Sequence, residues 1–136
     1  MNENIDRSRI AIQAAGLDDG GWSFEMMNQH KFIIDRADGR HYYADGINEG
    51  LNFIMEAERG MAIENGHALF AVHKAKFAGK NLLLTVPFEY QPPRKKKPVQ
   101  LFSLVKALLQ EMNETISIVL IGYEETDPTC IEIALF

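Results

Sequence analysis

The chain has 136 residues and a formal net charge of −5 at pH 7, a length that suits one ordinary domain. Hydrophobic residues make up 46% and charged residues 24%, which excludes a disordered chain, and the acidic balance argues against general electrostatic capture of DNA or RNA. No apolar run approaches the roughly 18 residues that cross a bilayer, and the polar first residues do not form a signal peptide. We therefore expect one domain over residues 1–136 and a cytoplasmic location.

The first half of the chain is expected to begin with a short helix at residues 4–15, followed by a glycine-rich loop to residue 20. Alternating apolar residues predict strands at residues 22–27, 31–36 and 40–43. Asp38-Gly39 lies between the last two strands and favours a tight hairpin turn. Asp45 is a suitable N-cap for a helix to about residue 65, where Asn65-Gly66 would end it.

The second half contains the most hydrophobic segments. Imperfect alternation predicts a strand at residues 67–77, and a second strand follows at residues 82–90, where Pro87 indicates an edge or an irregular position. An apolar stripe at helical spacing predicts a helix over residues 99–112. Two more strands are expected at residues 116–121 and 130–136.

Pairs of strands joined by short turns favour antiparallel pairing, and helices that follow such pairs favour an α+β fold. We therefore predict a single antiparallel sheet of about six strands in the order ββαββαββ. Two main helices would lie on one face, and the segment 1–20 would add a short, loosely docked N-terminal helix and its loop.

The most unusual local feature is a run of cations between prolines: Arg94, Lys95, Lys96 and Lys97. These side chains must be solvated, so the run could contact phosphates or an acidic surface. It could equally be a solvated loop that keeps a strand edge soluble. Nucleic acid, if the protein binds it, is expected at this basic segment.

Two other groups of residues are candidates for binding or chemistry. The acidic turn residues Glu124, Glu125 and Asp127 suit a partner with a basic surface. His41, Tyr42 and Tyr43 provide side-chain types used in acid–base catalysis, although cross-strand packing explains them as well.

The sequence gives no indication of a metal or a cofactor. Its single cysteine, Cys130, excludes an internal disulfide and a cysteine-rich cluster. The four histidines lack the spacing of zinc ligands. Motifs of nucleotide-binding loops, serine hydrolases and zinc proteases are absent from the sequence.

The leading hypothesis is a small non-enzymatic protein that binds another macromolecule, most simply a protein, as a regulator, adaptor or inhibitor of the immunity or mobile-element type. The first alternative is nucleic-acid or phosphate binding through Arg94 to Lys97. The second is a small enzyme with a site near His41, Tyr42 and Tyr43. The alternating apolar residues at the C-terminus also predict a homodimer through an edge strand.

Overall fold

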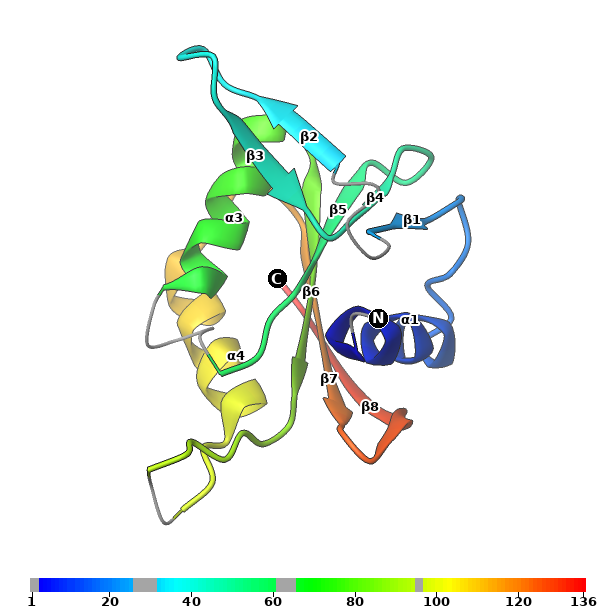
Figure 1. Ribbon diagram of the computed structural model, residues 1–136, viewed down its shortest axis with the longest axis vertical. Helices are drawn as coiled ribbons and strands as arrows, with labels where there is room; N and C mark the ends of the chain where they lie inside the picture. The colour runs from blue at the N-terminus through cyan, green and yellow to red at the C-terminus, as the bar shows by residue number, and fades with distance from the viewer. Residues whose placement is uncertain (1–2, 26–31, 61–65, 95–96) are drawn as a thin grey trace.

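A mixed six-stranded sheet with helices on both faces forms the centre of the molecule (Figure 1). The computed structural model describes residues 3–25, 32–60, 66–94 and 97–136. The strand order is β1-β4-β5-β6-β7-β8, and β2 and β3 pair as a separate two-stranded sheet. The elements are α1 (Glu3–Ala14), β1 (Ser23–Phe24), β2 (Phe32–Asp35), β3 (His41–Ala44), β4 (Gly46–Asn48), β5 (Phe53–Ala57), α3 (His67–Ala78), β6 (Asn81–Pro87), α4 (Leu101–Met112), β7 (Ile118–Glu124) and β8 (Asp127–Leu135).

The three central strands, β5, β6 and β7, are parallel. Helices α3 and α4 make the two crossovers between them. Crossovers of one hand that advance across a sheet in one direction return on one face, and both helices lie on the same side in Figure 1. The main core between these helices and the sheet includes Ile54, Leu82, Leu84, Val105 and Leu109.

The opposite face of the sheet is covered by α1 (Figure 1). Ile12 packs there in a second cluster of buried residues with Met55, Leu83, Ile121 and Tyr123. All five of these side chains are almost fully buried, so α1 is part of the folded body.

Polar side chains of α1 also join it to the sheet. The side-chain amide of Asn4 donates to the carbonyl oxygen of Ala57 at 3.0 Å, and its oxygen accepts from the hydroxyl of Tyr123 at 2.9 Å. The hydroxyl oxygens of Ser8 and Thr85 lie 2.6 Å apart, and both residues are fully buried. Buried polar groups need such partners, so these contacts fix where α1 sits on the sheet.

The α+β class is confirmed, but the prediction of a single antiparallel sheet is wrong. The sheet is mixed, because α3 and α4 each connect two parallel strands. Antiparallel pairing is confined to the flanks, where β1 pairs with β4, β4 with β5 and β7 with β8. The antiparallel prediction is wrong because two of the predicted elements have a different secondary structure in the protein.

The predicted helix from Asp45 to residue 65 is wrong over its described part, which forms the β4–β5 hairpin. Asn48 accepts the amide of Leu51 at 2.9 Å through its side-chain oxygen. Asn52 adopts a positive φ of 59°, a conformation that asparagine tolerates better than most residues. The carboxylate of Asp45 accepts the amide of Ala57 at 2.8 Å, so it binds the end of a strand and caps no helix.

The predicted strand at residues 67–77 is also wrong, because this segment is helix α3. Gly66 and Gly79 flank it with φ values of 67° and 68°, and glycine is the residue that adopts this left-handed conformation most readily. Apolar residues lie on the exposed side of the helix as well as on the buried side, and Leu69, Phe70 and Phe77 remain exposed. The apolar residues therefore show no clear helical periodicity, and their imperfect alternation resembles that of a strand.

The other predicted helices and strands overlap elements of the structure, although β1 covers only Ser23–Phe24 of the strand predicted at residues 22–27 and residues 26–27 lie outside the described residues. The hairpin of β2 and β3 turns at Gly39, which has a φ of 80°, and α4 buries the predicted apolar stripe. Strand β6 is central, yet its last pair with β5 is Thr85 with Ala57. Pro87 lies beyond that pair, so its missing amide leaves no residue of β5 without a hydrogen-bond donor.

Candidate functional site

A polar cluster lies between β5 and α3 on the main-core side of the sheet. It consists of Asp45, Glu56, Glu58, His67 and Lys74, and is named here the carboxylate–lysine cluster. Gly46 pairs with Met55, so the preceding residue, Asp45, comes opposite Glu56 across the hairpin. Glu56 has the same strand parity as Ile54 and therefore points toward α3, which supplies Lys74.

Glu56 and Lys74 form a buried ion pair in the middle of this cluster. Their side chains are only 5% and 11% exposed. The Lys74 ammonium also donates to the carbonyl oxygen of Tyr43 at 2.7 Å and lies 5.3 Å from the centre of the Phe70 ring. A buried charge pair contributes little net stability over apolar packing, whereas loss of one partner is costly.

Burial raises the pKa of the Glu56 carboxyl well above its usual value, and the nearby carboxylate of Asp45 raises it further, while Lys74 opposes both effects. Burial likewise raises the pKa of Glu58, and the His67 ring at 3.2 Å lowers it again. Carboxyl groups with raised pKa values beside a specific charged partner are typical of functional sites. The cluster therefore combines carboxyl groups that hold a proton more tightly than usual with a cation beside them.

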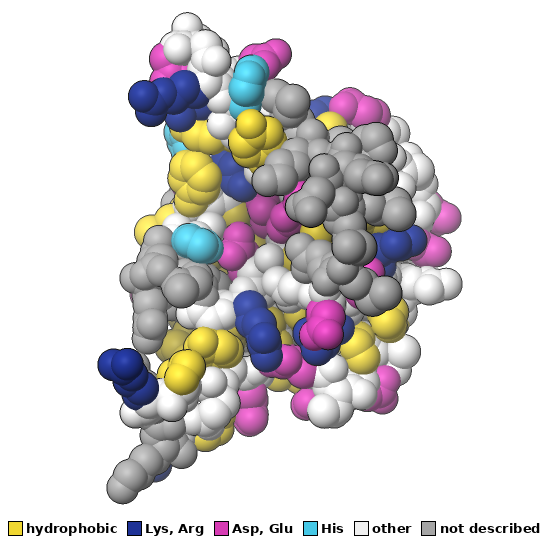
Figure 2. Space-filling view, in the orientation of Figure 1, with side chains coloured by type: hydrophobic (Ala, Val, Ile, Leu, Met, Phe, Trp, Pro, Cys, Tyr) yellow, Lys and Arg dark blue, Asp and Glu magenta, His cyan; other side chains and the backbone are white. Residues whose placement is uncertain are grey.

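The position of the cluster in the fold also suits ligand binding. Glu56 and Glu58 lie at the carboxyl end of the parallel strand β5, and His67 is the first residue of α3. Ligands of open α/β sheets commonly bind outside the carboxyl ends of parallel strands, where helix N-termini favour anions. On the face shown in Figure 2, acidic side chains, a histidine and Lys or Arg side chains gather over the region of β5 and α3.

The metal-binding capacity of the cluster rests on its carboxylates. Among the described residues, no group of three or more His, Cys, Asp or Glu side chains is arranged to hold a metal ion. Mg²⁺, however, needs only one or two carboxylates together with water and substrate oxygens. Asp45 and Glu56 provide such a pair of neighbouring carboxylates.

The basic segment predicted from the sequence lies at the same edge of the sheet, since it follows β6 as Glu58 follows β5. Arg94 and Lys97 are exposed, and Lys95 and Lys96 lie outside the described residues. At this edge the ring of Tyr90 packs directly on Gly60, where an added Cβ would come within 2.2 Å of it. The segment after β6 is thus close to the segment after β5.

The predicted acidic residues form the turn between β7 and β8. Glu125 pairs with Arg59 at 2.8 Å, and Asp127 accepts the hydroxyl of Thr129 at 2.6 Å. Glu124 is exposed at the end of β7. The hydroxyl of Thr126 donates to the Glu124 carboxylate at 3.3 Å, so all three carboxylates have partners within the chain.

The structure does not bring His41, Tyr42 and Tyr43 together at one point. His41 pairs with Asp35 at 2.9 Å, and its ring lies 6.4 Å from that of Tyr43. Tyr42 points the other way, toward α3, and its hydroxyl lies 3.1 Å from Nε2 of His73. The three residues alternate across β3, as strand geometry requires.

Sequence reasoning missed the carboxylate–lysine cluster. Its signal in the sequence was a charged residue within a mainly apolar stretch: Glu56 after Ile54-Met55, and Lys74 between Val72-His73 and Ala75. Charged residues are almost never fully buried unless they are paired. With 67–77 read as a strand, nothing placed Lys74 beside Glu56.

No protein-family model, curated protein or solved structure matches the chain significantly. In the part of the chain that the structure describes, no helix combines the length and apolar character needed to span a membrane.

Proposed function

We propose that the protein is a Mg²⁺-dependent phosphodiester hydrolase that acts on nucleic acid at the carboxylate–lysine cluster. The observation that carries this proposal is the placement of Glu56, a carboxyl only 5% exposed, against the carboxylate of Asp45 and the ammonium of Lys74. Such a site is costly to build for stability alone, and its parts are those of metal-assisted phosphoryl chemistry.

The carboxylate pair would provide the metal ligands. Two neighbouring carboxylates repel each other, which is one reason that the pKa of Glu56 is raised. A divalent cation held by Asp45 and Glu56 would remove this repulsion and favour the charged form of both. The chemistry that Mg²⁺ would supply there is the polarisation of a phosphate oxygen and the activation of water.

Hydrolysis needs charge stabilisation beyond the metal ion. Water adds to phosphorus, the bond from phosphorus to a sugar oxygen breaks, and that oxygen receives a proton. Lys74 is the cation available to neutralise the charge that builds on the phosphate oxygens. Glu58 and His67, which lie 3.2 Å apart, are the groups available to hold or release a proton.

The basic segment supports nucleic acid as the substrate class. Arg94 and Lys97 are exposed at the same edge of the sheet as Glu58. In a protein with net charge −5, local cations would position a phosphate backbone, whereas the acidic remainder would keep binding weak and salt-sensitive.

The test is an endonuclease assay with single-stranded and duplex DNA and RNA, in Mg²⁺, in Mn²⁺ and in EDTA. We expect metal-dependent cleavage that falls at least about a hundredfold in Glu56→Gln and in Asp45→Asn, because metal assistance contributes several kcal/mol. Glu124→Gln, an exposed carboxylate changed in the same way, is the control and should keep full activity. Cleavage that is absent, or equal in Glu56→Gln and wild type, would overturn the proposal.

A second candidate function is the binding of another protein or a second copy through β8. The observation that favours it is that β8 is an edge strand on which Ile133 and Leu135 are 42% and 74% exposed. Exposed apolar edge strands pair readily with other strands. A regulator, adaptor or inhibitor would use such an edge.

Light scattering over a range of concentrations tests this candidate. A dimer that dissociates in Leu135→Glu, and persists in Leu104→Glu on α4, would support pairing through β8. Leu104 is 47% exposed and controls for the loss of surface apolar area. A monomer of the chain mass at all concentrations, with no partner recovered by crosslinking, would exclude it.

A further inference from the structure

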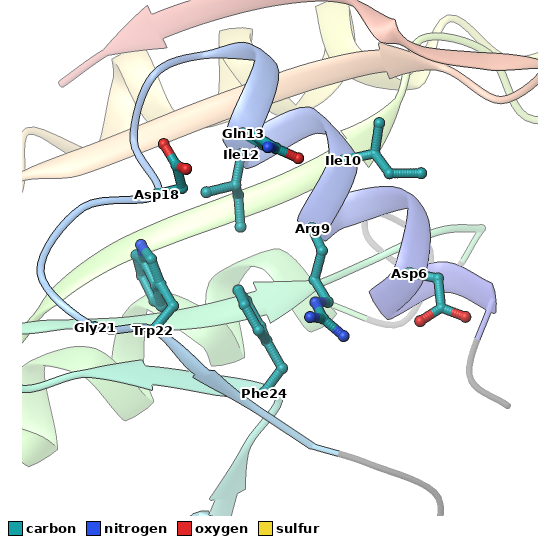
Figure 3. Close-up of a pocket in the computed structure, with 9 residues that line it drawn as sticks. All are labelled: Asp6, Arg9, Ile10, Ile12, Gln13, Asp18, Gly21, Trp22 and Phe24. Carbon is teal, nitrogen blue, oxygen red and sulfur yellow. The ribbon is translucent and has the colours of Figure 1, made fainter.

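A cavity of about 590 Å³ lies between α1 and the segment that leads into β1 (Figure 3). It is on the α1 face of the sheet, because Ile12, which lines it, belongs to the buried cluster beneath that helix. The carboxylate–lysine cluster is on the other face. The size is within the range of small-molecule sites, and the proposed hydrolysis makes no use of the cavity.

Two aromatic side chains form one wall of the cavity. The rings of Trp22 and Phe24 are nearly parallel, with centroids 5.8 Å apart and planes 14° apart, and both project toward α1 in Figure 3. The indole nitrogen of Trp22 donates to the carbonyl oxygen of Leu17 at 2.7 Å, which fixes the indole plane. The Arg9 guanidinium lies 5.2 Å from the centre of the Phe24 ring and closes one end of the wall.

Besides the aromatic wall and the apolar Ile10 and Ile12, the cavity is lined by polar side chains, two of which are acidic. Asp6 and Asp18 lie at the cavity together with Gln13. Against the single cation, Arg9, the two carboxylates leave a local charge of −1. A negatively charged ligand is therefore disfavoured, and a purely apolar one would leave the amide and carboxylates without partners.

We infer that this cavity binds the planar, uncharged heterocycle of a nucleoside. Aromatic faces stack on nucleobases whatever their sequence. The Gln13 amide presents one donor group and one acceptor, the pattern that pairs with an adenine edge. Carboxylates such as Asp18 accept hydrogen bonds from ribose hydroxyls and amino groups. Asp6 and Asp18 favour nucleosides over nucleotides, because their carboxylates repel each added phosphate group.

The chain contains one tryptophan, and it lies in this wall, so tryptophan fluorescence reports directly on the cavity. Adenosine is titrated into the protein in EDTA, with excitation where tyrosine does not absorb. We expect a saturable change in emission, a several-fold weaker response to AMP, a weaker one still to ATP, and none to ribose. The absence of a saturable change with adenosine, or binding of ATP that is tighter than that of adenosine, would overturn the inference.

Variants that keep Trp22 locate the binding. Gln13 is exposed on α1, so Gln13→Ala should fold normally and weaken adenosine binding about fivefold, the typical effect of one hydrogen bond. Phe24→Leu removes the second ring and should weaken binding about tenfold. Gln110→Ala, the same change at an exposed position of α4, is the control. Equal affinities in all three variants and wild type would place the ligand elsewhere and refute this site.

The inference is independent of the proposed hydrolysis. Glu56→Gln should bind adenosine as wild type does, whether or not it cleaves nucleic acid. Loss of adenosine binding in Glu56→Gln would contradict the placement of the two sites on opposite faces of the sheet.

Discussion

The Lys74→Met variant tests whether the buried cation compensates the carboxylates of the cluster. Methionine keeps the length and apolar stem of lysine but removes the charge. Glu56, 5% exposed, then lies beside Asp45 without its ion-pair partner. Removing one partner of a buried pair costs roughly 3–5 kcal/mol, a large share of the about 5–15 kcal/mol that holds a domain folded. With an unfolding entropy of about 0.3 kcal/mol/K for 136 residues, the melting temperature should fall by about 10–17 °C.

The same variant should show a distinctive pH dependence. The pKa of Glu56 is already raised in the folded state above its ordinary value of 4.5, and loss of Lys74 raises it further. A carboxyl with a raised folded pKa is most favourable when protonated, so its contribution is fully present below about pH 4.5 and is lost as the pH rises through the folded value. The destabilisation should therefore be largest at about pH 8 and smaller near pH 5.

Urea unfolding of wild type and variant at both pH values measures these differences. Lys76→Met is the matched control, because Lys76 lies on the same helix but is 46% exposed and pairs with Glu114 at 2.8 Å. An exposed pair of this kind contributes less than about 1 kcal/mol. If Lys74→Met costs no more than Lys76→Met, or if its cost does not change with pH, then Glu56 is not an uncompensated buried carboxylate and the reasoning fails.

Three further outcomes are expected. Mg²⁺ at ten times its dissociation constant should stabilise the protein by about 1.4 kcal/mol. Scanning fluorimetry should show this as a rise of about 5 °C in melting temperature, and the rise should be absent in Glu56→Gln. Gly122→Ala places a methyl 2.5 Å from the Phe102 ring and should cost about 1–3 kcal/mol in urea unfolding; Phe102→Leu should restore part of the loss, and a neutral effect would contradict the packing. Tyr123→Phe removes the hydrogen bond to Asn4 and should cost about 1 kcal/mol. Burial raises the pKa of Tyr123 to about 12, so the free energy of unfolding of wild type should decrease as the pH rises above 10. Tyr123→Phe has no such group and should show a smaller decrease. The same decrease in both proteins would refute this prediction.

The sequence predicted correctly those elements whose pattern of apolar and turn residues fits only one type of secondary structure. The residues of α4 combine an apolar stripe with a polar face, and its buried side chains Leu101, Phe102, Val105 and Leu109 match that stripe. The β2–β3 hairpin follows from Asp38-Gly39, since few residues adopt the turn geometry at low cost. Local chemistry determined these elements.

The segment between these elements was misassigned because local and tertiary preferences differ there. In α3 the exposed positions include Leu69, Phe70 and Phe77 beside the polar His67, His73 and Lys76, so no continuous polar face marks the helix. In the β4–β5 hairpin the residues that turn the chain are Asn48 and Asn52, which also occur in helices. The secondary structure of both segments depends on burial against a parallel sheet. A short stretch of sequence contains no information about that burial.

The candidate site was unpredictable for a related reason. The cluster combines Asp45, which lies between β3 and β4, with Glu56 of β5 and Lys74 of α3. Only the correct hairpin register and crossover bring these residues together. The basic segment was visible because its four cations are consecutive. When a site is formed by residues that are far apart in the sequence, its only sign in the sequence is an isolated charged residue within an apolar run.

The docking of α1 has a consequence for the far side of the sheet. The Asn4 amide binds the carbonyl of Ala57, the residue between Glu56 and Glu58, so α1 restrains the strand end that carries both carboxylates without contributing to the site. One side chain of α1 therefore helps to hold in place the strand end that carries the carboxylates of the opposite face.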